Sequence, residues 1–286
     1  MEVRMTGSSG YLGKVITAEL EKKGNHVKGI SRELLFGPAE KLSDAIKDTA
    51  VLINLAGAPV LQRWTPGNQK EIYNSRVQTV QNLVRAIQNL PVKQRPLKVI
   101  SASAIGIYAS GKLHSEESRK FDTGFLGELV KDWEQAWQQL PEGLRLTIFR
   151  IALVLGKESS VIKKLILSFK LGIGSKIGSG KQPFPFVHEA DLAQAFQWAI
   201  ETPNAGGVFN LAAPQQITNE DFTRTLADIL HRPALFAVPP FALRMVYGKA
   251  STLLTQSPAV MPHNLLKKNF VFRYSTIDKA LENIFR

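Results

Sequence analysis

The stretch Thr6-Gly7-Ser8-Ser9-Gly10-Tyr11-Leu12-Gly13 decides the fold of this chain. It follows an apolar run that includes Val3 and Met5, and it opens onto a run of helical character over 14–23. In a dinucleotide-binding loop the first glycine makes a tight turn, the second lets the backbone approach a pyrophosphate, and the third lets helix and strand pack closely. The helix N-terminus then faces the phosphates with free N–H groups. This order of strand, glycines and helix predicts a bound dinucleotide.

Short apolar strands alternate with longer amphipathic helices through the first two-thirds of the chain. This alternation predicts an α/β fold, a Rossmann-type doubly wound parallel sheet covered on both faces. The expected strands are 3–5, 26–30, 51–55, 98–102, 146–151 and 208–211. The expected helices are 14–23, 68–89, 126–140, 160–171, 189–201 and 219–230.

The alternation weakens past about residue 235, where Val238-Pro239-Pro240-Phe241 marks a joint. We therefore expect a dinucleotide-binding domain over 1–235, which crosses to the substrate side around 156–190. A smaller, mostly helical C-terminal segment over 236–286 follows on the substrate side. The glycine-rich segment 172–180 lacks a strand before it and a helix after it, so it predicts a surface turn and not a second phosphate loop.

Composition narrows the class of protein. The chain has 286 residues, of which 44% are hydrophobic, and it has no cysteine, which excludes disulfides and zinc–thiolate sites. No apolar run reaches the roughly 18–20 residues that span a bilayer. The chain enters its first strand directly, without room for a signal peptide. We expect a cytoplasmic protein with no membrane partner. The five histidines are far apart, and we expect no metal site.

The net charge of +12 comes from scattered lysines and arginines. There is no basic arm and no basic–aromatic interleaving of the kind that stacks bases. The charge therefore indicates a solvated basic surface that attracts phosphorylated ligands, and we expect no nucleic-acid partner.

The end of the second expected strand bears on the choice of dinucleotide. An acid at this place bonds the ribose 2′-hydroxyl of NAD, whereas an arginine accommodates the 2′-phosphate of NADP. Here the strand ends in Ser31-Arg32, and Arg32 offers a fork of charged donors while Ser31 adds a hydroxyl. Glu33, one residue later, could still serve a ribose. The residues favour NADP over NAD.

A third strand end carries small residues. Val51-Leu52-Ile53-Asn54 leads into Leu55-Ala56-Gly57, which could lie flat against an adenine or a ribose. Taken alone this pattern fits a core strand and a turn equally well, but the glycine loop upstream favours binding.

Several segments together resemble the extended short-chain dehydrogenase/reductase superfamily, the group of NAD(P)-dependent sugar epimerases and dehydratases. They are the glycine loop, 54–57, 101–108, 150–156, 185–193 and 209–214. The chain is most similar to an atypical branch, the "epimerase family protein" group. Proteins of that group have a tryptophan followed by a helix with Ser-Arg, and residues 63–65 and 75–77 match these two features. Residues 261–274 resemble the group's C-terminal segment.

The resemblance implies a site for each part of the cofactor. The pyrophosphate would be held by Gly7, Ser9, Gly10, Tyr11, Leu12 and Gly13, the 2′-phosphate by Ser31 and Arg32, and the adenosine side by Leu55, Ala56 and Gly57. Ser75 would face the cofactor cleft and Leu153 would lie near the nicotinamide. Helix surface and core remain the alternatives for Ser75 and Leu153.

The usual catalytic residues of this superfamily are a serine and a Tyr-x-x-x-Lys pair on one helix face. Ser103 fits the serine position, but alignment on Trp133-Glu134 places Leu126 and Val130 where tyrosine and lysine should stand. Neither side chain can transfer a proton. Tyr108 belongs to a loop, as Gly111 indicates, and is a candidate for a cleft acid or for a tyrosine packed at the cleft wall. Ser103 is a candidate catalytic or cleft-lining hydroxyl.

Two functions therefore stay open. One is an NADP-dependent oxidoreductase or nucleoside-diphosphate-sugar epimerase-like enzyme with an unusual proton donor, acting on a small molecule. The other is a non-catalytic NADP-binding sensor or interaction protein. The two long helices expected over 68–89 and 126–140 could form the helix-pair homodimer of this superfamily.

Overall fold

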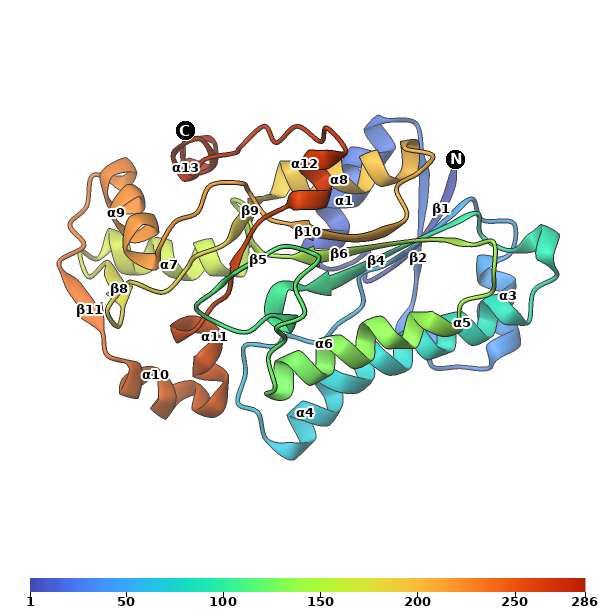
Figure 1. The fold of residues 1–286 in the computed structure, drawn as a ribbon, viewed down its shortest axis with the longest axis horizontal. Helices are drawn as coiled ribbons and strands as arrows, with labels where there is room; N and C mark the ends of the chain where they lie inside the picture. Colours follow the sequence, from blue (N-terminus) through green and yellow to red (C-terminus); the bar gives the residue numbers. More distant parts are fainter. Residues whose placement is uncertain (286) are drawn as a thin grey trace.

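Six parallel strands form the central sheet of the computed structural model, which describes residues 1–285 (Figure 1). Their order is β10-β6-β4-β3-β1-β2, and the chain reverses direction of growth between β1 and β3. Ligands of open α/β sheets bind at such a switch point, outside the carboxyl ends of the strands. The strands are β1 (Glu2–Thr6), β2 (His26–Ile30), β3 (Val51–Asn54), β4 (Lys98–Ala104), β6 (Arg145–Ile151) and β10 (Gly207–Leu211). The predicted α/β Rossmann-type fold is confirmed.

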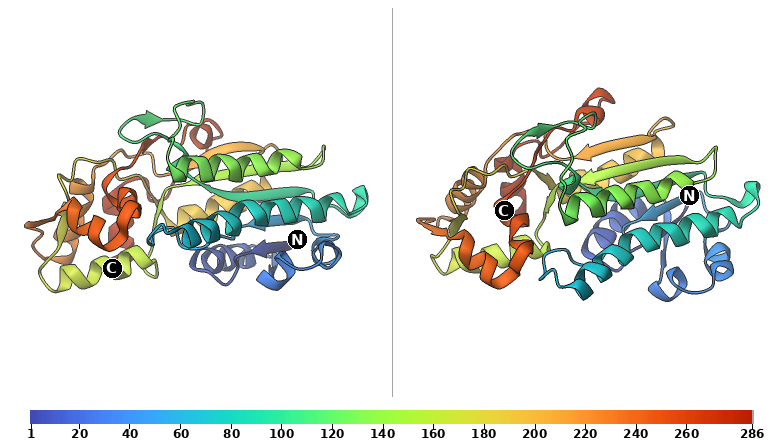
Figure 2. Two further views of the ribbon diagram at one scale, coloured as in Figure 1. Left: turned by 90° about the horizontal axis from the view of Figure 1, so that it is seen from below. Right: turned by 60° about the horizontal axis from the view of Figure 1, so that its bottom comes forward.

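Helices cover both faces of this sheet (Figure 2). Helices α1 (Tyr11–Lys22) and α8 (Glu189–Glu201) pack on one face, in a core that includes Met5, Ile16 and Phe196. Helices α3 (Ala39–Ile46), α5 (Thr79–Gln88) and α6 (Phe125–Gln135) cover the other. Strand β3 serves both cores: Val51 and Ile53 lie in the first and Leu52 in the second. This alternation follows from the two-residue period of a strand.

The expected helix over 68–89 is interrupted in the structure. It consists of α4 (Pro66–Tyr73), a π-helical turn Asn74–Gln78 and α5. Helices α8 and α9 (Asn219–Leu230) match their predicted bounds, and α7 (Ser160–Lys170) differs by one residue. The short α2 (Arg32–Leu35) and α3 were not predicted, because neither run is long enough to show a clear period.

A third cluster of buried side chains forms the smaller lobe. It joins α7, α9 and α13 (Ile277–Phe285) around Phe169, Phe222 and Leu281. The segment predicted as a surface turn over 172–180 contains β8 (Ser175–Ile177), which pairs with β11 (Phe236–Val238). That prediction was wrong for these three residues, since their partner residues lie 61 positions away in the chain and leave no local signal.

The C-terminal stretch runs across both lobes. After α10 (Pro240–Tyr247) and α11 (Thr252–Thr255), β12 (Ala259–Val260) pairs with β5 (Leu113–His114). Helix α12 (His263–Lys267) and the residues after it add Leu265, Phe270 and Phe272 to the core of the large sheet. The domain boundary at 235/236 stays a prediction. Within residues 1–285 no helix is long and apolar enough to cross a membrane.

Candidate functional site

The glycine loop has the geometry that a phosphate site requires. Gly7 adopts a φ of +69°, and its carbonyl accepts a hydrogen bond from the N–H of Gly10 at 3.1 Å. A Cβ on Gly13 would lie 2.3 Å from the Gly7 carbonyl oxygen, so only glycine lets α1 approach the loop. No side chain caps α1 at Gly10. The first N–H groups of α1 therefore remain available to an anion.

Tyr11 contributes its backbone to this loop but turns its side chain elsewhere. The hydroxyl donates to Glu189 Oε2 at 2.5 Å. It lies against Gly156, where a Cβ would be only 2.1 Å from the tyrosine oxygen. Burial and the Glu189 carboxylate both raise the pKa of Tyr11 far above its usual value. Tyr11 thus ties the glycine loop to the start of α8.

The residues predicted to hold a 2′-phosphate follow β2. Ser31 is the N-cap of α2, and its oxygen accepts from the N–H of Leu34 at 3.3 Å. Arg32 is exposed, and its guanidinium carbon lies 6.0 Å from the centre of the Phe36 ring. A hydrogen bond from Ser31 lowers the pKa of Glu33, so this acid stays ionised beside the arginine. Arg32 is free to meet a phosphate, whereas the Ser31 oxygen is partly committed to its helix.

The loop after β3 is held by a buried threonine. Thr6 Oγ1 accepts from the N–H groups of Leu55 and Ala56, both at 3.1 Å, and donates to Asn54 Oδ1 at 2.7 Å. These backbone donors are therefore spent inside the protein, and Leu55 and Ala56 offer side chains and not N–H groups to a ligand. Thr6 shows no local sign of this role, because its partner Asn54 is 48 residues away.

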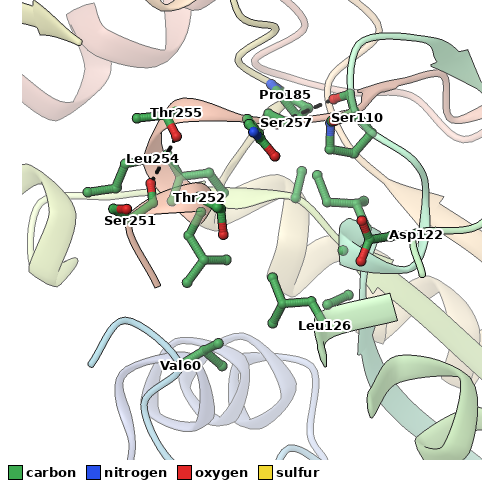
Figure 3. Close-up of a pocket in the computed structure, with 18 of the residues that line it drawn as sticks. Val60, Ser110, Asp122, Leu126, Pro185, Ser251, Thr252, Leu254, Thr255 and Ser257 are labelled. Atoms are coloured by element: carbon green, nitrogen blue, oxygen red, sulfur yellow. Dashed lines mark hydrogen bonds between the residues drawn. The ribbon is translucent and has the colours of Figure 1, made fainter. Parts of the chain in front are cut away.

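A cleft of about 1280 Å³ opens between the large sheet and the smaller lobe. This exceeds the roughly 300–1,000 Å³ of an ordinary ligand pocket, so it has room for a cofactor and a substrate together. Of the predicted cofactor residues, Leu12, Leu55, Ala56, Gly57 and Leu153 line it. Figure 3 shows the hydroxyl-bearing segment 251–257 across the cavity from Val60 and Leu126.

The π-helical turn after α4 places Ser75 and Arg76 differently. Ser75 Oγ accepts from the N–H of Ala58 and donates to the carbonyl of Ile72, both at 2.9 Å. Ser75 is not among the residues that line the cleft, whereas Arg76 is. Ser75 holds the loop after β3 against the helix, and Arg76, for which the sequence suggested no role, faces the cleft instead.

The two predicted catalytic residues belong to one buried polar network. Ser103 donates to Glu134 Oε1 at 2.6 Å, and Glu134 forms a bidentate ion pair with Arg150, with N–O distances of 2.8 and 2.6 Å. The Tyr108 hydroxyl accepts from Arg150 at 2.8 Å and donates to Asn210 at 2.8 Å. Ser103 and Tyr108 line the cleft, yet both hydroxyl protons are donated to protein acceptors. Burial is the largest influence on Tyr108, and it raises the pKa of this side chain. The catalytic roles of Ser103 and Tyr108 stay predictions.

Helix α6 presents apolar residues where a proton relay would stand. Leu126 and Val130 both line the cleft, while Lys131 is exposed and lies outside it. Tyr108 follows the 3₁₀ turn Ile105–Ile107, and Gly111 has a φ of +74°, so the sequence Tyr-x-x-x-Lys over 108–112 lies in a loop and not on a helix face.

His188 and Asp191 hold the start of α8 and the C-terminal stretch. His188 Nδ1 accepts from the N–H of Ala190 at 3.1 Å, so the imidazole caps the start of α8. Helix α8 begins at Glu189, as predicted, and Asp191 lies in its first turn. The Asp191 carboxylate instead accepts from the N–H groups of Arg273 and Tyr274 at 2.8 and 3.0 Å.

Residues 3–212 match the model of the NAD dependent epimerase/dehydratase family, and residues 238–284 match a domain of unknown function, DUF1731. The chain belongs to the NAD-dependent epimerase/dehydratase family. The epimerase family protein YfhF of Bacillus subtilis is 30% identical over 99% of this chain and 98% of its own length.

A second relative in this family is the chloroplastic SDR39U1 homolog of Arabidopsis thaliana. It is 27% identical over 100% of this chain and 87% of its own length. The crystal structure of human epimerase family protein SDR39U1 with NADPH superposes with a TM-score of 0.92 at 31% identity, covering 99% of both chains. The similarity to the epimerase family protein group is thus confirmed over the whole chain.

Proposed function

We propose that this protein binds NADP(H) along the carboxyl edge of the sheet and acts as an oxidoreductase or epimerase-like enzyme on a small molecule in the cleft. The observation that carries the proposal is the uncapped start of α1 behind Gly7, Gly10 and Gly13, which opens beside a cleft large enough for cofactor and substrate. The human relative bound to NADPH and the arginine after β2 support NADP over NAD.

The chain's own residues suit a carbonyl or sugar-nucleotide-like substrate. Bound NADPH supplies a hydride. The apolar side chains Leu126, Val130 and Leu153 keep water from this part of the cleft, and the hydroxyl groups of 251–257 offer hydrogen bonds to the substrate. The standard Tyr/Lys pair is absent. Asp122 is the one carboxyl group lining the cleft within residues 1–285, which leaves this acid or water to provide a proton.

A non-catalytic NADP-binding sensor or interaction protein is the second candidate. The observation that favours it is the apolar pair Leu126 and Val130 in the cleft, together with the commitment of the Tyr108 proton to Asn210. Oxidation of bound NADPH by any member of a panel of aldehydes, ketones and sugar nucleotides supports the enzyme. Tight NADPH binding without turnover across that panel supports the sensor.

Cofactor binding is tested by parallel titration with NADPH and NADH, followed by cofactor fluorescence and thermal shift. Arg32→Ala should weaken NADPH binding by about 10- to 100-fold, the effect of charge-assisted hydrogen bonds, and leave NADH binding unchanged. Arg85→Ala, which removes an exposed charge from α5, is the matched control. Absence of binding of either nucleotide to the wild-type protein would refute the proposal.

A further inference from the structure

Arg76 is a cation in the cleft without a carboxylate partner. Its guanidinium donates to the carbonyls of Ile72 at 3.2 Å and Ala58 at 3.0 Å, and weakly to Ser75 Oγ at 3.4 Å. Within residues 1–285 no acid pairs with it. Burial lowers the pKa of Arg76 to about 10, so the side chain is still charged at neutral pH. Arg76 is half-buried, and a charge removed from water without a counter-charge is costly to keep unless something neutralises it.

A second donor lies beside Arg76. Trp133 lines the same cleft and lies under the guanidinium, with the ring centre 5.4 Å from Cζ. Its indole Nε1–H is buried and has no hydrogen-bond partner. An indole nitrogen and a guanidinium are donors only, so neither can satisfy the other. A cation without a counter-charge and a buried donor without a partner lie side by side in one cleft, and together they favour a ligand that brings acceptor oxygens.

The cleft as a whole carries a net positive charge, like Arg76 itself. Its lining includes Arg76 from the large sheet side and Arg244 and Lys249 from the smaller lobe, against one carboxylate, Asp122. Asp122 Oδ1 accepts from the N–H groups of Gly124 and Gly127, so this acid is already engaged at the start of α6. The lining therefore carries two uncompensated positive charges.

The position of Arg76 relates it to the predicted cofactor site. A Cβ on Gly57 would lie 2.9 Å from Arg76 Cζ, so the guanidinium packs directly against the loop after β3. The segment that carries Arg76 is the π-helical turn Asn74–Gln78, and such turns occur frequently at functional sites. The extra residue of this turn is a local distortion that helix propensity does not explain.

We propose that Arg76 binds an anionic group, a phosphate or a carboxylate, of the ligand that fills the cleft. This inference rests on the proposed function, because it assigns a residue to the same cleft. The anion has two sources: the diphosphate of the cofactor, or an acidic group on the substrate. Arg244 and Lys249, which line the same cleft, would help to draw either one in.

The test compares the wild-type protein with Arg76→Gln and with Arg85→Gln, which removes the same charge from an exposed position on α5. The first arm measures NADPH affinity by fluorescence. The second titrates inorganic phosphate into NADPH-saturated protein and follows thermal stability. Arg76→Gln should lose about 10- to 100-fold in affinity in the first arm if the cofactor is the source, and in the second if the substrate is.

Equal affinities of wild type and Arg76→Gln in both arms would overturn the inference. Arg76→Met keeps the apolar stem on Trp133 and replaces Arg76→Gln if the latter does not fold, and Arg76→Lys should recover part of the loss because it restores the charge. If the wild type fails to bind NADPH, the proposed function fails separately. Phosphate titration of the cofactor-free protein then decides the role of Arg76 by itself.

Discussion

The buried ion pair between Glu134 and Arg150 makes a strong prediction about stability. Glu134 accepts two hydrogen bonds from the guanidinium at 2.8 and 2.6 Å, and the two side chains are only 13% and 7% exposed. Glu134→Gln removes the negative charge and leaves the arginine buried without a counter-charge. Breaking a buried pair in this way costs about 3–5 kcal/mol. We therefore expect a loss of this size in the free energy of unfolding.

The measurement is chemical denaturation together with thermal unfolding. A change of 1 kcal/mol shifts the midpoint of a chain of this size by about 2–4 °C, so the expected loss is about 6–20 °C. The control is Glu158→Gln, which breaks the pair with Lys163, whose side chains are 68% and 56% exposed. Surface pairs contribute about 0–1 kcal/mol.

The double variant Glu134→Gln/Arg150→Met should recover part of the loss, because no buried charge is then left unpaired. If Glu134→Gln costs no more than Glu158→Gln, the network is not a stabilising feature of the cleft wall. That result would favour a catalytic role for Ser103 and Tyr108, whose hydroxyls bind to this network.

Two further expectations concern the glycine loop and α8. Gly13→Ala should lower stability by about 1–3 kcal/mol through overpacking and weaken NADPH binding, as seen by denaturation and titration, whereas Gly67→Ala, with open space around it, should do neither. Burial lowers the pKa of His188 to about 4, so the unfolded chain takes up the proton more readily. The free energy of unfolding of the wild type should therefore fall as the pH drops from 6.5 towards 4. The loss should be about 3 kcal/mol larger than in His188→Asn, which keeps a capping acceptor but does not titrate. Parallel acid unfolding curves of the two proteins would contradict this.

The sheet strands could be predicted from the sequence because each is an apolar run with glycine or proline near its ends. The strand predicted at 26–30 has the observed bounds of β2, and the others differ by one or two residues at their ends. The pairing of β8 with β11 could not be predicted. Both strands are three residues long, and a run of that length shows no periodic pattern. The interruption of the long helix at 74–78 was also missed, because a π-helical turn has no distinct period over five residues.

The candidate site divides in the same way. Glycine spacing predicted the loop at 7–13, whose turn and close helix packing depend on backbone conformation within a few residues. The partners of Ser103 and Tyr108 were not foreseen. Glu134 is a helical acid with no local sign of burial, and the Tyr108 bond to Asn210 joins residues 102 positions apart.

The sequence by itself determined the order of strands and helices and the glycine loop, because these depend on short-range periodicity and on the conformations open to glycine. It also determined that Leu126 and Val130 stand on α6 at the two positions where the superfamily usually has tyrosine and lysine. Only the tertiary structure decided which hydroxyls are engaged, that Ser75 supports the wall while Arg76 lines the cleft, and that the C-terminal stretch completes both lobes. These outcomes depend on contacts between distant segments, and no local pattern specifies which segments will meet.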